Sequence, residues 1–70
     1  MDKQQQIAAV DRAELANLYH TARIPLAGKR DIDGTSMDTP YQRKLIASRW
    51  YHEAHPEISE RAAYLAFERN

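Results

Sequence analysis

The segment TPYQRKLIASRWYHEA, residues 39–54, decides the fold because its two ends and its apolar pattern all indicate one helix. Thr39 is a good N-cap residue, and Pro40 suits the first helical position because a proline there loses no helical hydrogen bond. Pro56 ends the helix, because the residue before a proline avoids helical geometry. We therefore expect a helix over residues 40–54.

This helix is apolar on two sides. Ile46, Trp50 and Ala54 form one stripe at helical spacing, and Tyr41 and Leu45 form a second stripe. A helix of this kind is either the central helix of a core or a contact surface. Because a chain of 70 residues has little protein to cover both sides, the pattern favours a contact surface.

Residues 2–23 are predicted to be helical, because they are rich in Gln, Ala, Leu and Glu and contain no Gly or Pro. Asp11 lies in the middle of the apolar face of this helix, which is an awkward place for a carboxylate. Three roles are open for Asp11. It can be the N-cap of a new helix, with Glu14 completing a capping box, it can pair with an arginine on a neighbouring helix or subunit, or it can be exposed to solvent. A break at Asp11 makes four helices instead of three. The apolar face comprises Ile7, Leu15, Leu18 and Ala22.

Residues 57–69 are predicted to form the last helix, which starts near Pro56 or Ser59. Glu57 and Arg61 have the spacing of a favourable i, i+4 ion pair. This helix is again apolar on two sides. Its core stripe comprises Ile58, Ala62 and Leu65, and its other side carries Ala63, Tyr64 and Phe67.

Residues 24–39 form the one long irregular stretch of the sequence. Pro25 disfavours a helix just before it, and Gly34 marks a turn. Ile32 and Met37 are the apolar residues that would hold the loop onto the helices. A loop of this length in so small a domain is either functional or mobile.

Together these elements predict a single all-α domain over residues 1–70, with three helices, or four, and one long loop. A chain of this size buries only about 60% of its unfolded surface, so small domains commonly add a disulfide, a metal or a partner subunit. The sequence contains no cysteine, which excludes a disulfide and removes the usual thiolate ligands of zinc. A partner subunit is the remaining way to stabilise so small a domain, and we expect a homodimer. The expected contact is made by the first helix through Ile7, Val10, Leu15 and Leu18.

An aromatic and basic surface on the helix 40–54 is the candidate partner-binding site. Trp, Tyr and Arg are the residue types that are enriched at protein-interaction hot spots. By size and character the chain is typical of a small bacterial or phage regulator or inhibitor that covers the surface of a larger protein. For Trp50 the alternative is a place in the core. The candidate residues are Tyr41, Arg43, Arg49, Trp50 and Tyr51.

DNA binding is the alternative function. The stretch Asp11–Arg23 resembles the first half of a helix-turn-helix, and this resemblance implies a small dimeric DNA-binding regulator. Pro25 and Gly28 interrupt the chain where the recognition helix would follow, so the basic helix 40–53 would have to read the DNA. Ten basic and ten acidic residues give a net charge of zero, which weighs against a nucleic-acid binder. The basic residues of that helix are Arg43, Lys44 and Arg49.

No residue pattern indicates a catalytic, metal or cofactor site. Ser36, Ser48 and Ser59 lack the context of a nucleophile. His52 and His55 have the spacing to hold a metal with a nearby glutamate, but two histidines at a helix end more often cap the last carbonyls. We therefore expect a non-enzymatic protein without a cofactor. The absence of cysteine, of a signal-peptide pattern and of a membrane-length apolar run predicts a cytoplasmic protein.

Overall fold

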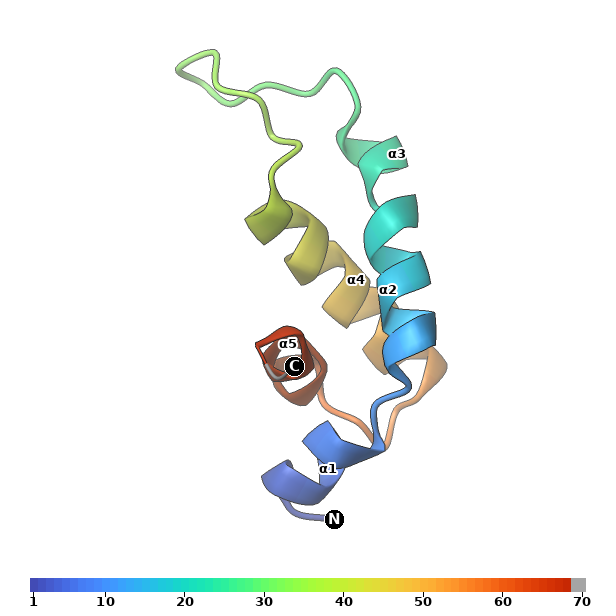
Figure 1. Ribbon diagram of the computed structural model, residues 1–70. Coiled ribbons are helices and arrows are strands. Elements are labelled where there is room, and N and C mark those ends of the chain that lie inside the picture. Colours follow the sequence, from blue (N-terminus) through green and yellow to red (C-terminus); the bar gives the residue numbers. More distant parts are fainter. Residues whose placement is uncertain (69–70) are drawn as a thin grey trace.

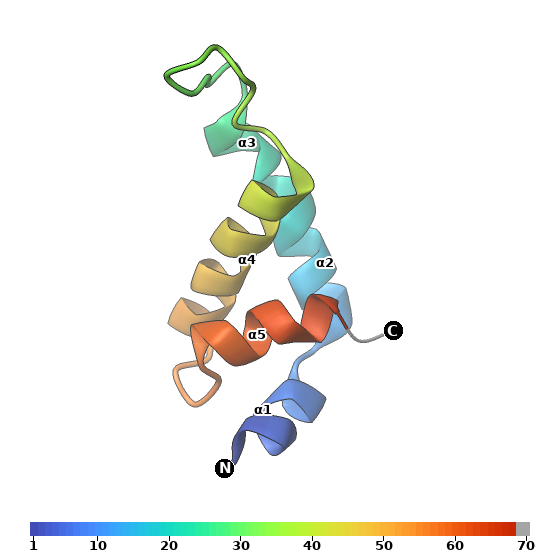
Figure 2. The ribbon, with the colours of Figure 1, turned by 90° about the vertical axis from the view of Figure 1, so that its left-hand side faces the viewer.

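A computed structural model describes residues 1–68 and shows a bundle of helices from which one long loop projects (Figure 1). α4 lies alongside α2 and also packs against α5, which runs across α4 and contacts α1 (Figure 2). The all-α class with one long loop is therefore confirmed. The helices are α1 (Lys3–Ala9), α2 (Arg12–Thr21), α3 (Arg23–Leu26), α4 (Pro40–Ala54) and α5 (Glu60–Phe67).

The first predicted helix is broken at Val10 and Asp11, and α1 and α2 meet there at a corner. Asp11 is the N-cap of α2, and its carboxylate accepts the backbone N–H groups of Ala13 and Glu14 at 3.0 and 3.2 Å. Of the three roles considered for Asp11, the helix cap is therefore the one that the structure shows.

The ends of α4 agree with the prediction, whereas α5 is shorter than expected. The Thr39 hydroxyl accepts the N–H of Gln42 at 3.2 Å, Pro40 stands at the first helical position, and the helix ends before His55. The N-cap of α5 is Ser59, so residues 57–59 precede the helix. The predicted end of this helix at residue 69 lies outside the described residues.

Small side chains make up much of the buried surface of α4 and α5. Ala47 on α4 and Ala62, Ala63 and Ala66 on α5 are at most 2% exposed. Because an alanine carries only one methyl group, two helices that meet at alanines approach each other closely. Larger side chains complete the core, namely Ile7, Val10, Leu15, Tyr51 and Ile58.

The stripe Ile46, Trp50 and Ala54 is not the buried face of α4. Ala54 is exposed, and Ile46 and Trp50 are half-buried. α4 is covered from two directions, by α2 and by α5, so its buried face is set by the packing of these two helices and differs from the stripe seen in the sequence. The buried residues of α4 are Ala47, Ser48 and Tyr51.

The chain stays helical past α2 for one more turn, contrary to prediction. This turn, α3, contains Ile24 and Pro25. Pro25 lies in the first turn of α3, where its missing N–H interrupts no helical hydrogen bond. Leu26 is 5% exposed and anchors the turn. The loop therefore spans residues 27–39, and we call it the arm.

The arm is closed by backbone hydrogen bonds and extends beyond the paired ends of α2 and α4 (Figure 1). Arg30 and Ser36 form an antiparallel bridge between its two sides. At its tip, the Asp31 N–H donates to the Thr35 carbonyl at 2.7 Å. Gly34 has a φ of +85°, a conformation that glycine adopts readily and other residues rarely adopt.

The two apolar residues of the arm differ from each other. Ile32 was expected to hold the loop on the helices, and this prediction is wrong, because its side chain is 103% exposed at the tip. Met37, near the base of the arm, is half-buried. The arm is thus anchored at its base and presents an isoleucine at its end.

Candidate functional site

The five predicted partner-binding residues do not form one surface. Tyr51 was expected to be available to a partner without being part of the core, and this is wrong. It is 2% exposed, and its hydroxyl accepts the backbone N–H of Asp11 at 2.8 Å. Its ring reaches the corner between α1 and α2, which no pattern within α4 alone reveals. Trp50 is half-buried, so its exposure lies between that of a surface residue and that of a core residue.

Arg43 is committed to the base of the arm. Its Nε and Nη2 atoms donate to the two carboxylate oxygens of Asp38 at 2.6 and 2.9 Å. Its guanidinium also lies 5.6 Å from the ring centroid of Tyr19 on α2. The hydrogen bonds from Arg43 lower the pKa of Asp38 below its usual value, and the same bonds raise the pKa of Arg43. Arg43 therefore acts as a fixed link between α4 and the arm.

The other two basic residues of α4 also face acidic partners. Lys44 Nζ lies 3.7 Å from a carboxylate oxygen of Glu68, and Arg49 Nε lies 3.5 Å from one of Glu60. Exposed ion pairs of this kind contribute little to stability. They do offset the positive charge that a DNA-reading helix would present to phosphates. The geometry thus gives no support to α4 as a DNA reader.

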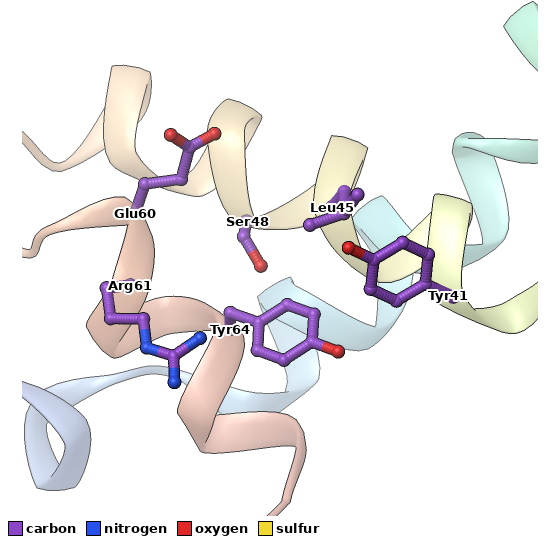
Figure 3. A pocket seen from close by; sticks show the side chains of 6 residues that line it. All are labelled: Tyr41, Leu45, Ser48, Glu60, Arg61 and Tyr64. Atoms are coloured by element: carbon purple, nitrogen blue, oxygen red, sulfur yellow. The ribbon is translucent and has the colours of Figure 1, made fainter.

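Tyr41, the remaining candidate, lines a groove between α4 and α5 with a volume of about 280 Å³ (Figure 3). We call it the α4–α5 groove. α4 supplies one wall and α5 the other, and side chains of both helices extend into the space between them (Figure 3). The lining residues are Tyr41, Leu45, Ser48, Glu60, Arg61 and Tyr64.

Two tyrosine rings form one end of the groove. The ring centroids of Tyr41 and Tyr64 are 6.4 Å apart, with an interplanar angle of 76°, which is an edge-to-face pair. Tyr41 is 57% exposed. Neither hydroxyl has a hydrogen-bond partner within residues 1–68. The rings therefore offer both apolar surface and unused hydrogen-bonding groups.

Arg61 lies on the other side of the Tyr64 ring from Tyr41, with its guanidinium 5.8 Å from the ring centroid (Figure 3). The expected ion pair with Glu57 is not formed. Because α5 begins only at Glu60, Glu57 is not one helical turn below Arg61, and its carboxylate lies 3.8 Å from His55 Nδ1 instead. Within the described part of the chain, Arg61 therefore has no carboxylate partner.

The remaining polar groups near this region serve the fold. Ser48 is fully buried, and its hydroxyl donates to the Lys44 carbonyl at 2.6 Å. His52 Nδ1 donates to the Ile58 carbonyl at 2.6 Å, and His55 Nε2 lies 2.9 Å from the Glu14 carboxylate. Among residues 1–68 no group of three or more His, Cys, Asp and Glu side chains is arranged to hold a metal ion.

Sequence reasoning found part of the groove and missed the rest. The sequence showed that α4 carries a second apolar stripe, with Tyr41 and Leu45, and that α5 carries a second apolar side, with Tyr64. It did not identify Arg61, because the residue was assigned to an ion pair. The sequence also could not show that Tyr41 and Leu45 on α4 lie opposite Tyr64 on α5.

The predicted dimer contact needs correction. Ile7, Val10 and Leu15 are 3%, 6% and 2% exposed, and Leu18 packs partly buried against the same core cluster. These side chains already fill the core of one protomer, so they leave almost no surface for a second one. A dimer must therefore use a different face.

Comparison of the chain with models of protein families, with curated proteins and with solved structures finds no match. In the described residues, no helix combines the length and the apolar character needed to cross a membrane. The arm and the α4–α5 groove are therefore the features that bear on function.

Proposed function

We propose that this protein is a small non-enzymatic regulator or inhibitor that acts by binding another protein, and that it forms a homodimer. Its place of action in this proposal is the cytoplasm. The observation that carries the proposal is the α4–α5 groove, where two tyrosine hydroxyls without a hydrogen-bond partner in residues 1–68 lie together with an arginine that has no carboxylate partner there.

The size of the groove favours a side chain of another protein over a small-molecule ligand. Pockets for small molecules usually measure about 300–1,000 Å³ and enclose most of the ligand. The α4–α5 groove, at about 280 Å³, lies just below that range and is open along one side. A space of this size accepts one or two side chains from a partner surface.

The lining of the groove indicates which side chains fit. The rings of Tyr41 and Tyr64 and the side chain of Leu45 offer apolar contact, and tyrosine and arginine are typical hot-spot residues. Arg61 and the two hydroxyls are suited to a carboxylate. Glu60 does not repel an acidic partner strongly, because Arg49 lies 3.5 Å from it. The partner is thus expected to present an apolar side chain next to an acidic one.

A pull-down with a matched control tests this proposal. The tagged protein and its Tyr41→Ala variant are exposed to a lysate of the native host, with Ile24→Ala as a control, since Ile24 is 64% exposed and lies outside the groove. We expect a captured protein that the wild type and the control retain and Tyr41→Ala loses. With the purified partner, loss of a hot-spot side chain should weaken binding by about thirtyfold, which corresponds to about 2 kcal/mol. Equal capture by all three proteins would show that the groove is not the binding site.

A further inference from the structure

We propose that the α4–α5 groove binds the tip of the arm, Asp31-Ile32-Asp33, from a second copy of this chain. This inference rests on the proposed function, because it takes the groove to be a protein-binding site. It also replaces the first helix as the predicted dimer contact.

Ile32 presents its whole side chain to solvent. It is 103% exposed, compared with 64% for Ile24 and 57% for Tyr41. The tip that carries it is held in shape, because the Gly34 N–H donates to the Asp31 carbonyl at 2.9 Å. An apolar side chain on a preformed turn loses less conformational entropy on binding than one on a disordered loop. The tip is therefore suited to insertion into an apolar space.

Two carboxylates flank Ile32 and have no cationic partner among residues 1–68. One oxygen of Asp31 accepts the Ile32 N–H at 2.6 Å, and one of Asp33 accepts the Thr35 N–H at 3.0 Å. These hydrogen bonds leave lone pairs on both carboxylates, and neither residue forms an ion pair within residues 1–68. The bonds to Thr35 lower the pKa of Asp33, so this group is ionised at neutral pH.

The groove and the tip are complementary. The groove combines apolar walls with a cation, Arg61, that has no carboxylate partner in the described residues. The tip combines an apolar side chain with two carboxylates that have no cationic partner in that same part of the chain. Contact of Ile32 with the exposed ring of Tyr41 and the side chain of Leu45 would bring Asp31 or Asp33 within reach of Arg61 and of the tyrosine hydroxyls.

The arm cannot reach the groove of its own protomer. It extends from the ends of α3 and α4 away from α5, as both views of the ribbon show (Figure 2). Its base is also fixed by the bonds between Arg43 and Asp38. The occupant is therefore the arm of another copy. Two copies related by a twofold axis can exchange their arms, which makes each contact twice.

Sedimentation equilibrium of the full chain tests this proposal at about 1–100 µM, a range suited to a contact with a dissociation constant near 10 µM. Ile32→Ser removes the apolar tip, and Arg61→Glu reverses the charge of the groove. Ile24→Ser and Lys3→Glu are matched controls, because Ile24 and Lys3 are exposed and lie outside both surfaces. We expect the wild type and both controls to approach twice 8.1 kDa at high concentration. Each of the two test variants should remain a monomer.

Mixing the two test variants provides the sharpest result. The Ile32→Ser protein keeps an intact groove and the Arg61→Glu protein keeps an intact tip, so the mixture can form one of the two contacts. We expect it to associate more weakly than the wild type but at least tenfold more tightly than either variant alone. Far-UV circular dichroism checks the fold, and a cyclic peptide of residues 29–37 should dissociate the wild-type dimer even if a variant fails to fold.

A wild type that remains a monomer at 100 µM would overturn the inference. An Ile32→Ser protein that dimerises like the wild type would overturn it as well, and would assign the dimer to another face. Neither result bears on the pull-down, where loss of capture in Tyr41→Ala depends only on the groove. A monomeric wild type would also remove the homodimer from the proposed function, whereas the binding of another protein in the groove is tested separately by the pull-down.

Discussion

The hydroxyl of Tyr51 accepts the backbone N–H of Asp11 at 2.8 Å, a bond between groups 40 residues apart in the sequence. In a capping box this N–H is bonded by the side chain at the third helical position, which is Glu14 here. Because Tyr51 takes that place, the Glu14 carboxylate is available to His55, whose Nε2 atom lies 2.9 and 3.0 Å from its two oxygens. Two contacts thus join the start of α2 to the end of α4.

Tyr51→Phe should destabilise the protein although it keeps the buried ring. The change removes the partner of the Asp11 N–H, and one hydrogen bond of this kind contributes about 0.5–1.5 kcal/mol. Urea unfolding monitored by circular dichroism measures the loss. Tyr41→Phe is the control, because the Tyr41 hydroxyl has no partner within residues 1–68 and its removal should change the free energy of unfolding by less than about 0.5 kcal/mol. Equal values for the two variants would contradict a structural role of the Tyr51 hydroxyl.

Enlarging a buried alanine of α4 should also be costly. Ala47 is fully buried where the helices come close, so Ala47→Leu forces them apart at a cost of about 1–3 kcal/mol. Ala54→Leu introduces the same side chain at an exposed position of the same helix and should be nearly neutral. Thermal unfolding compares the two variants. If Ala47→Leu proves as stable as Ala54→Leu, the close approach of the helices is incorrect.

The pair of Asp38 and Arg43 should give a defined pH dependence. The hydrogen bonds from Arg43 lower the pKa of Asp38 in the folded state, so the pair contributes stability above the unfolded pKa of about 3.9. That stability is lost as the pH falls through the lowered folded pKa. In Asp38→Asn the free energy of unfolding should therefore fall less between neutral and acidic pH than it does in the wild type. The free energy of unfolding of both proteins, measured between pH 2 and pH 7, gives the comparison, and parallel curves would show that the pair contributes nothing.

Amide hydrogen exchange should distinguish the arm from the helices. Most backbone bonds of the arm are exposed, so its amides should exchange faster than those of residues 42–52 in dilute protein. If the arm of one copy is bound by another, protection at the tip should rise with protein concentration while that of α4 stays constant. Protection at the tip that equals that of α4 in dilute protein would contradict an exposed arm.

Local signals in the sequence predicted both ends of α4 and included the helix cap among the three roles considered for Asp11. Thr39, Pro40 and Asp11 act through their immediate neighbours, so their roles could be read from the residues that follow them. Pro25 was misjudged because its effect depends on where a helical turn begins. These features involve only a few consecutive residues.

Tertiary features required information that the sequence does not contain. Tyr51 is buried because its hydroxyl meets the corner between α1 and α2, which depends on the packing of three helices. The groove exists because Tyr41 and Leu45 of α4 lie opposite Tyr64 of α5, which depends on how the two helices pack. The exposure of Ile32 follows from hydrogen bonds within the arm, whereas its residue type alone favours burial.

Isotope-filtered NMR on an equal mixture of labelled and unlabelled protein tests most directly whether the groove binds the arm of another copy. Such a spectrum contains only contacts between different copies. The account predicts nuclear Overhauser effects from the Ile32 methyl groups to the rings of Tyr41 and Tyr64, which weaken on dilution and disappear in Arg61→Glu. Ile32 methyl groups without any intermolecular contact at millimolar concentration, with tyrosine ring resonances unchanged by dilution, would contradict it.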